Sequence, residues 1–561
     1  MDVFSPTSSS GVLVLLLMGV LVCILPPSPA PATPQPSTDS SSSAPPHLGL
    51  VWTPPSPPDS ALAALDRLAA TGATAVRLTH LPPDTLATRA DSLGLQLYVD
   101  LPISHVPAAS LADTLSQVAP TLNRLLALAT RHSSVAHVGL ARIADTTVPV
   151  ACRTLREWTN RVHEQAPSVQ TYYVTPFPPA VDRCGDAVDR PLLDLRGHPR
   201  PDERWRAWAA HTEAVGIGAL GTWTRPSASS GLQVPRSPER QARYLEEAFA
   251  QLLDSTRTAP PVLFVARWQD AAAPRLPSRR YGLHDGPGRS RPAAAVVRGV
   301  YSGTQRTFAF ADGSPPARSH APLLLGWGLV ALLGGLYAGN LFVRQTVVRY
   351  FTAPGFYRDA LRDGHDLSPA ANGLLLVLVA AALGIAGARA AQLAAAHPGT
   401  EHVLRSLPNA LQSTLAQGVG HPALAGLSVG GLALGLLLLW MGALIGAARL
   451  SARFSLAQGL VLVTWPCWPA LLIVPVALAA GPNAPLSPWA FALLLLGGGG
   501  VALLLQTVRV LSDFWRVVDA PPWTVLLLFV LSPSALTSAA VLAAAYDGVP
   551  VRFLWRLAVH A

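Results

Sequence analysis

The sequence predicts an α/β protein: an extracytoplasmic (β/α)8 barrel followed by an all-α polytopic membrane domain of about six transmembrane helices. Half of the 561 residues are hydrophobic and only 13% are charged, against about 25% charged residues in an average soluble chain. Eight apolar, strand-like stretches alternate with amphipathic helices over 48–311, which is typical of a closed parallel barrel. From residue 322 onward the chain is dominated by long apolar stretches.

The N-terminal segment 1–25 is predicted to be a signal peptide or an N-terminal anchor. Its apolar run GVLVLLLMGVLVCIL (11–25) is shorter than a full membrane span and is followed by small residues in SPAPA. The next segment, 26–47, is rich in Pro and Ser and has almost no large apolar side chain. It is therefore expected to be a linker.

Strands of the predicted barrel are short apolar stretches rich in Val, Leu and Tyr. Helices are expected between most of them, for example over 59–71 and 237–255, where Ser237 and Pro238 form a helix start. The connections between 175 and 215 leave the least room for helices. The eight predicted strands are 48–53, 75–80, 95–103, 135–141, 169–175, 191–197, 215–223 and 262–270.

The C-terminal half is predicted to contain a transmembrane helix (323–343), a cytoplasmic interfacial segment (344–372), a five-span membrane domain (373–545) and a tail (546–561). The five spans are expected at 373–395, 424–448, 459–480, 489–508 and 523–545, each near the length that a bilayer requires. Arginines orient them, because the arginine-rich side of a membrane protein is cytoplasmic. We therefore expect an integral protein of the cell (inner) membrane with the barrel on the extracytoplasmic side. The cytoplasmic set is Arg344, Arg349, Arg358, Arg362, Arg449, Arg453, Arg509 and Arg516, and the opposite set is Arg389, Arg405, Arg552 and Arg556.

Candidate ligand-binding residues lie where the barrel strands end, because barrels of this type carry their chemistry there. Arg77 could bind a ligand oxygen or form an internal pair with Asp100. Tryptophans at a barrel mouth suit the faces of sugar rings, although they can equally be core residues. The predicted mouth residues are Arg77, His80, Asp100, Trp223, Trp268 and Asp270.

The remaining chemistry-bearing residues give few signals. Cys152 and Cys184 share one region and could form a disulfide if that region is extracytoplasmic; two separate buried thiols are the alternative. No spacing of Cys or His indicates a metal site, and no cofactor is predicted. The basic residues form no stripe interleaved with aromatic residues, so no nucleic-acid partner is expected.

Several barrel segments resemble family 2 glycoside hydrolases, in the same order along the chain. GATAVRLTHLPP (72–83) resembles their second strand and LGLQLYVDLPISHVP (93–107) their third. ATRHSSVAHVGLARI (129–143) resembles the fourth-strand segment that ends in Asn-Glu. SPERQARYLEEAF (237–249), VLFVARWQD and RYGLHDGPGRSRPAAAVV (280–297) resemble the closing segment. The resemblance covers about 48–311 and implies a glycosidase-like barrel.

Both catalytic glutamates of that family are absent from the matching positions. Arg142 stands where the Asn belongs, Ile143 where the acid/base Glu belongs, and Ala219 where the nucleophile belongs. Ordinary glycoside hydrolysis requires two carboxyl groups that flank one bond, about 5–5.5 Å apart for a retaining enzyme. The carboxylates left near strand ends are those of Asp145, Asp100 and Asp270.

The membrane region resembles bacterial Yip-family membrane domains. VVRYFTAPGFYRDALRDGHDLSPAANGLLLVLVAAAL (347–383) has the basic, aromatic and proline-containing start of such domains, and TWPCWPALLIVPVALA (464–479) fits a middle span. The residues that carry this resemblance are Tyr350, Phe351, Pro354, Phe356 and Tyr357.

Three functions follow as hypotheses. The first is a membrane-anchored, catalytically inactive pseudoenzyme that binds a glycan or an extracytoplasmic protein at its barrel mouth. The second is an active O-glycosyl hydrolase with relocated carboxylates, Asp145 acting with Asp100 or Asp270. The third is a membrane scaffold or channel in which the barrel is a spacer.

Overall fold

A computed structural model describes residues 45–561, apart from 57, 213, 226–228, 255–257, 272–275, 277–278, 316–320, 365–367, 451–453, 480–487 and 547–549. The predicted signal peptide and all but the last residues of the predicted linker lie outside the described residues.

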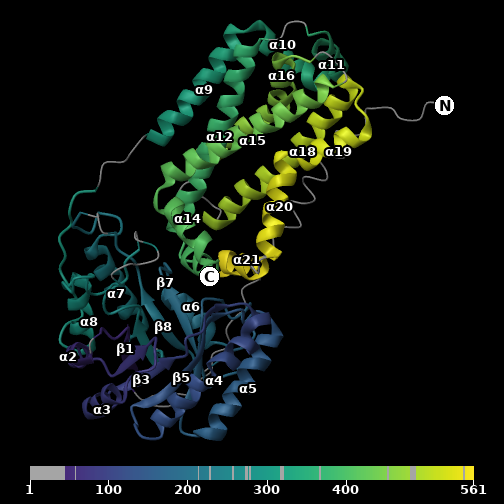
Figure 1. Ribbon diagram of the computed structural model, residues 1–561. Coiled ribbons are helices and arrows are strands. Elements are labelled where there is room, and N and C mark those ends of the chain that lie inside the picture. Colours follow the sequence, from purple (N-terminus) through teal and green to yellow (C-terminus); the bar gives the residue numbers. More distant parts are fainter. Residues whose placement is uncertain are drawn as a thin grey trace. The chain divides into compact units, whose positions relative to one another are not determined.

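Eight parallel strands close into a barrel (Figure 1). Each strand pairs in parallel with the next, β3 pairs with β5, and β1 closes the ring by pairing with β9. A short extra strand, β4 (Ser104–Val106), pairs with the last residues of β5. The predicted barrel is therefore confirmed. Its strands are β1 (His47–Trp52), β2 (Ala75–Leu78), β3 (Gln96–Asp100), β5 (Val135–Ala144), β6 (Gln170–Thr175), β7 (Arg190–Arg196), β8 (Gly216–Gly221) and β9 (Val262–Val265).

Helices follow seven of the eight barrel strands. β6 is the exception, because the described residues 176–189 that join it to β7 contain no helix. Asp182 organises this connection: its buried carboxylate accepts hydrogen bonds from the hydroxyls of Thr146, Tyr173 and Thr175 and from the amide of Cys184. The barrel helices are α2 (Pro58–Ala69), α3 (Asp84–Leu93), α4 (Ala108–Ala129), α5 (Pro149–Gln165), α6 (Pro201–Ala209), α7 (Pro238–Leu252) and α8 (Pro292–Tyr301).

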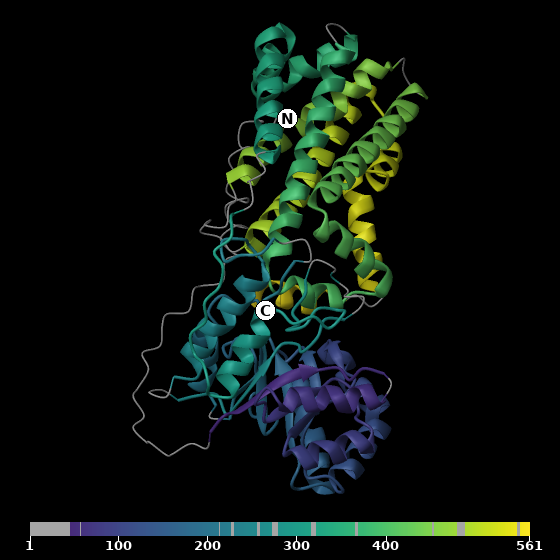
Figure 2. The ribbon, with the colours of Figure 1, turned by 90° about the vertical axis from the view of Figure 1, so that its left-hand side faces the viewer.

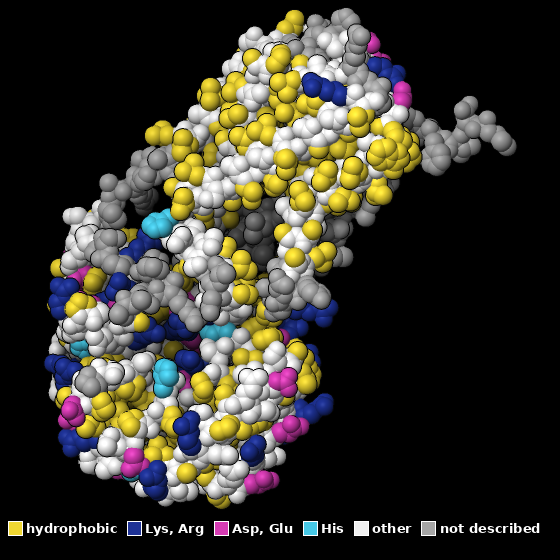
Figure 3. All heavy atoms as spheres, in the orientation of Figure 1, with side chains coloured by type: hydrophobic (Ala, Val, Ile, Leu, Met, Phe, Trp, Pro, Cys, Tyr) yellow, Lys and Arg dark blue, Asp and Glu magenta, His cyan; other side chains and the backbone are white. Residues whose placement is uncertain are grey.

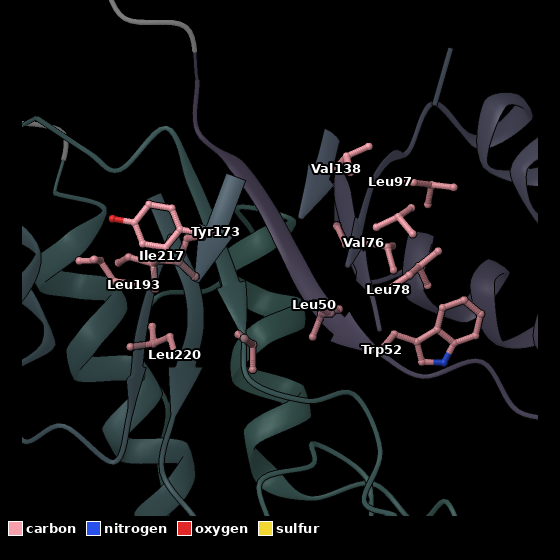
Figure 4. Close-up of a cluster of buried hydrophobic side chains, with 14 of the residues drawn as sticks. Leu50, Trp52, Val76, Leu78, Leu97, Val138, Tyr173, Leu193, Ile217 and Leu220 are labelled. Atoms are coloured by element: carbon pink, nitrogen blue, oxygen red, sulfur yellow. The ribbon is translucent and has the colours of Figure 1, made fainter. Parts of the chain in front are cut away.

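The barrel has an inner and an outer apolar layer because successive side chains of a strand point to opposite faces. Figure 4 shows Val76, Leu78 and Leu97 of the outer layer pointing from their strands toward the helices. Glycine makes room for large rings inside, since a Cβ on Gly139 would lie 2.6 Å from the ring of Tyr172. The inner layer consists of Ala75, Tyr98, Tyr172, Val174, Leu192, Val262 and Phe264.

The chain beyond residue 320 is helical. In Figure 3 apolar side chains cover the face of these helices that is in view, whereas charged side chains gather over the barrel. The helices are α9 (Ala321–Gly339), α10 (Leu341–Thr352), α11 (Pro354–Asp363), α12 (Pro369–Ala396), α13 (Thr400–Arg405), α14 (Asn409–Gly420), α15 (Pro422–Arg449), α16 (Leu456–Cys467), the 3-10 helix η1 (Trp468–Leu472), α17 (Ile473–Ala479), α18 (Pro488–Val518), α19 (Pro522–Val530), α20 (Pro533–Tyr546) and α21 (Val551–His560).

Within the described residues, three helical segments are long and apolar enough to cross a membrane: 369–396, 422–449 and 456–478. The pair α19 and α20, bent by 49°, would make a fourth, and the apolar segment Leu324–Gly339 is shorter. The chain is thus compatible with a membrane protein, whereas six spans and the side on which the barrel lies stay predictions. So does the resemblance to Yip-family domains.

Two of the predicted spans, 373–395 and 424–448, pack closely through small residues. Helices α12 and α15 lie side by side (Figure 2). A Cβ on Gly384 would lie 2.9 Å from the carbonyl oxygen of Gly426, and one on Gly430 would lie 2.9 Å from that of Ala380. Such spacing of small residues allows two backbones to approach, as is common between membrane helices.

Candidate functional site

We call the C-terminal ends of the barrel strands the barrel mouth. An internal ion pair joins two of these strand ends. Arg77 donates from Nε and Nη2 to the two carboxylate oxygens of Asp100, over 3.0 and 2.9 Å, and from Nη1 to the carbonyl oxygen of Gly218. Tyr172 donates its hydroxyl to the same Asp100 carboxylate. Of the two predicted roles for Arg77, the structure shows the internal pair.

Two guanidinium groups lie against the ring of Trp223, which is buried. The guanidinium carbon of Arg236 lies 3.6 Å from its ring centroid and that of Arg279 lies 4.1 Å away. Tyr281 packs against the ring edge. In this structure the two guanidinium groups lie where a sugar ring would stack, so sugar binding by Trp223 stays a prediction. The strand pattern does not reveal either arginine, because both come from loops.

Trp268 and Asp270 each contact other residues of the barrel. Trp268 belongs to the outer apolar layer, and its ring centroid lies 4.2 Å from that of His284. Asp270 accepts hydrogen bonds from the amide of Gly282 and from Arg291, over 2.8 and 2.5 Å. His80 is exposed, with its ring bonded to the hydroxyl of the neighbouring Thr79. None of the three lines the cavity described below.

Ile143 is covered by the last helix of the chain. It has a backbone φ of +57°, a left-handed conformation that is a strong outlier for a β-branched residue. Its buried side chain packs with Phe177 of the barrel and with Phe553 and Leu557 of α21. The position expected for an acid/base glutamate is therefore part of an apolar contact with α21.

Asp145 is bound by the same helix. Both of its carboxylate oxygens lie within hydrogen-bonding distance of Nη1 of Arg556, at 3.0 and 2.9 Å. Thr147 donates its hydroxyl to Asp145 over 2.6 Å. Arg556 and Thr147 thus occupy both oxygens of the Asp145 carboxylate.

Helix α13 brings a further carboxylate to the mouth. Glu401 forms ion pairs with Arg405 of its own helix and, at 3.5 Å, with Arg196 of β7. Arg196 also binds Asp194 through three hydrogen bonds from its side chain. Although burial opposes it, Arg405 and Arg196 hold the pKa of Glu401 well below its usual value, and Arg196 lowers that of Asp194 to about 2.

Two histidines meet where α13 enters the mouth. Nε2 of His105 lies 3.4 Å from Nδ1 of His402. Burial lowers the pKa of His105 and lowers that of His402 to about 4, and nearby arginines add to both shifts. Both rings are therefore neutral at pH 7. His105 has a φ of +59°, so two neighbouring strand ends, at His105 and Ile143, contain left-handed residues.

A loop of the barrel holds the end of α12. Arg279 donates hydrogen bonds to the carbonyl oxygens of Ala395 and His397, over 2.8 and 2.7 Å, and to that of Pro398. Cations favour the C-terminal end of a helix, where carbonyl groups lack partners. The side chain that covers Trp223 thus also anchors the segment leading into α13.

A small polar cavity of about 50 Å³ remains in the mouth. Cavities that bind small organic ligands are usually several hundred Å³, so this one has room for a few waters but not for a sugar ring. Ile143 and Ala219, the two positions of the missing glutamates, both line it. Its charged lining residues are Arg77, Arg142, Asp194, Arg196, Arg267 and Arg405.

Five charged or titratable residues of the mouth are not among the residues predicted from the sequence: Asp194, Arg196, Glu401, His402 and Arg405. Asp194 and Arg196 end the predicted strand PLLDLRG, so the rule that located Asp100 could have found them. Glu401, His402 and Arg405 gave no such signal, because they lie between two predicted spans.

Cys152 and Cys184 form a disulfide that joins α5 to the connection between β6 and β7. Such bonds persist mainly in oxidising compartments. Within the described ranges, no group of three or more His, Cys, Asp or Glu side chains is placed to hold a metal ion.

Comparisons with known proteins found structural neighbours only. No family model matches the chain, and no curated protein matches it. Similar solved structures include a GH2 β-galacturonidase from Eisenbergiella tayi, with 16% identity over 46% of this chain and 51% of that one and a TM-score of 0.39. A β-glucuronidase from Ruminococcus gnavus has 17% identity over 46% and 50% and a TM-score of 0.41. The chain thus spans about half the length of these proteins.

Proposed function

We propose that this protein is a membrane-anchored pseudoenzyme: a glycosidase-like barrel that does not hydrolyse glycosides and whose mouth is a binding surface. The partner that the geometry favours is the helical part of the same chain, through α13 and α21. The observation that carries this proposal is the contact of α21 with Ile143 and Asp145, where Phe553, Leu557 and Arg556 cover these two strand-end residues.

The pairing of the mouth carboxylates with arginines supports this proposal. A general acid in a glycosidase has a raised pKa so that it is protonated at working pH. The mouth carboxylates of Asp100, Asp145, Asp194 and Glu401 are instead each paired with an arginine.

The alternative hydrolase is less favoured by the geometry. Its carboxylates at Asp145, Asp100 and Asp270 have separate partners: Arg556, Arg77 and Arg291, respectively.

The alternative of a membrane scaffold or channel with the barrel as a spacer predicts that residues of the mouth can be changed without functional consequence. An external glycan or protein partner would require α13 and α21 to leave the mouth, because the remaining cavity is too small.

A hydrolysis assay tests the proposal. The full chain in lipid nanodiscs would be incubated with a panel of nitrophenyl glycosides and with oligosaccharides that are then weighed by mass spectrometry. We expect no product above the rate of the buffer. Turnover that the variants Asp145→Asn, Asp194→Asn or Glu401→Gln each reduce at least tenfold would identify relocated catalytic carboxylates and overturn the proposal. A set of exposed substitutions, such as Glu203→Gln, is the matched control, since its side chain is half exposed.

A further inference from the structure

The barrel mouth contains more positive than negative charge. Five arginines line its cavity: Arg77, Arg142, Arg196, Arg267 and Arg405. Three carboxylates, those of Asp100, Asp194 and Glu401, pair with members of this set. The histidines His105 and His402 are neutral at pH 7, because their pKa values are lowered. An excess of two positive charges remains.

Arg142 and Arg267 carry this excess. Nε of Arg142 lies 3.5 Å from Asp100, which Arg77 already holds in a closer bidentate pair, and this Nε is buried without a hydrogen bond. The side chain of Arg267 has no ion pair or hydrogen bond with the part of the chain that the structure describes. Burial and the neighbouring arginines Arg196 and Arg405 lower the pKa of both guanidinium groups.

Uncompensated cations in a buried site are costly. The free energy of this arrangement would fall if an anion entered the cavity between the arginines. A phosphate monoester carries about −1.5 to −2 charges at pH 7, which balances the excess, whereas one carboxylate would leave a positive charge. The fork of donors on each guanidinium also matches the oxygens of a phosphate group.

We propose that the cavity lined by Arg142 and Arg267 binds a phosphate group. The cavity of about 50 Å³ has room for one such group but for no attached ring. This inference deepens the proposed function, since it names the ligand chemistry of the same mouth. It is tested by binding, whereas the proposed function is tested by hydrolysis, so either can fail alone.

A second cavity beside the first bears on the source of the phosphate. It measures about 160 Å³, and Arg405 lines both cavities. Its other walls include the apolar side chains of Leu276, Leu404 and Ala416. A free phosphate ion would use the arginine-lined cavity alone, whereas the headgroup of an anionic lipid could leave an acyl chain beside Leu404.

The experiment measures binding of two probes to the full chain in nanodiscs made of zwitterionic lipid. Inorganic phosphate and dioctanoyl phosphatidic acid would be titrated at constant ionic strength, with the Tm and the heat of binding as readouts. We expect saturable binding of at least one probe and a rise in Tm, because a ligand that binds only the folded state stabilises it. The double variant Arg142→Gln/Arg267→Gln should weaken that binding at least tenfold.

The Tm of the variants without ligand shows whether they are folded. Arg142 and Arg267 are partly buried, and only the longer 3.5 Å contact with Asp100 pairs Arg142. Their removal should therefore leave the Tm of the double variant in chloride unchanged or higher, which shows that it is folded. The control Arg200→Gln/Arg289→Gln removes two charges from side chains that are 71% and 82% exposed and should bind as the wild type does. Binding of phosphate assigns a free ion and binding of phosphatidic acid alone assigns a lipid. No binding of either probe, or equal binding by the double variant, overturns the inference.

Discussion

Ile143 at the end of β5 packs against Leu557 of α21, more than 400 residues further along the chain. Two observations give this contact its meaning. Ile143 occupies the position at which the resemblance to glycoside hydrolases places the acid/base glutamate, and its backbone is left-handed, with a φ of +57°. Strain of this kind costs about 1–3 kcal/mol and persists only where the surroundings impose it. The apolar contact with α21 can hold Ile143 in this left-handed conformation.

Leu557→Ala should destabilise the barrel mouth. The side chain is fully buried, and truncation of a buried leucine costs about 2–5 kcal/mol through lost transfer energy and the cavity left behind. Thermal unfolding of the full chain in nanodiscs measures the effect. Val559→Ala on the same helix is the control, because Val559 is 39% exposed, and it should change stability by less than about 0.5 kcal/mol. Equal effects of the two substitutions would contradict the described contact.

Asp145 and Arg556 should be energetically coupled. Removal of either partner leaves a largely buried charge without compensation, so Asp145→Asn and Arg556→Gln should each cost about 1–3 kcal/mol. The double variant should cost less than the sum of the two, with a coupling energy of about 1 kcal/mol or more. A double-mutant cycle on the free energy of unfolding measures this coupling. Strict additivity would mean that α21 does not dock on Asp145.

Loss of the disulfide should destabilise the barrel. Cys152 and Cys184 are 32 residues apart, and closure of a loop of this size contributes about 3.7 kcal/mol in the chain-entropy account. Cys152→Ser/Cys184→Ser should therefore lower the Tm by several degrees. Alkylation followed by mass spectrometry, with and without reduction, checks the bond in protein purified from membranes. Free thiols at both positions without reduction would contradict the bond and the predicted extracytoplasmic location.

Acidification should weaken the docking of α13. His402 faces His105, Asp194, Arg196 and Arg405, and its pKa in the folded protein is about 4, below the ordinary 6.5. Between these two pH values His402 binds a proton in the unfolded chain but not in the folded chain. The free energy of unfolding therefore falls as the pH drops from 6.5 to 4. The pKa of Asp194 is about 2, so its own contribution is lost only below this window.

The Tm measured against pH tests this effect by difference. Between pH 6.5 and pH 4, the free energy of unfolding of His402→Asn should fall by about 1–3 kcal/mol less than that of the wild type, so its Tm should also fall less. His211→Asn is the control, because His211 is exposed and its ring bonds to the backbone carbonyl of Ala207 at the end of its own helix. A wild-type curve that is flat over this window would contradict the buried neutral histidine.

The barrel could be predicted because its signals are local. Every predicted strand overlaps an observed one, since the apolar pattern and the flanking turn residues of each strand are contained in a short stretch of sequence. The Arg77–Asp100 pair could also be proposed, because the two residues end adjacent strands of a parallel sheet.

The covering of the mouth could not be predicted, because it depends on contacts between distant parts of the chain. The sequence places Trp223 at a strand end, but Arg236 and Arg279, which lie against its ring, come from loops without a recognisable pattern. Glu401 and Arg556 reach the mouth only because the chain folds back after predicted membrane spans. The hydrophobic periodicity of the sequence does not indicate which distant segments will contact one another.

Hydroxyl-radical footprinting of the full chain in nanodiscs tests the central claim, that α21 closes the barrel mouth, most directly. Radicals oxidise side chains that water reaches, and Val150, 43% exposed, is an internal reference. We predict that Ile143 and Phe177 are protected in the wild type and are oxidised in Phe553→Ala/Leu557→Ala, while Val150 reacts equally in both. Oxidation of Ile143 and Phe177 in the wild type at the rate of Val150 would show an open mouth and contradict the account.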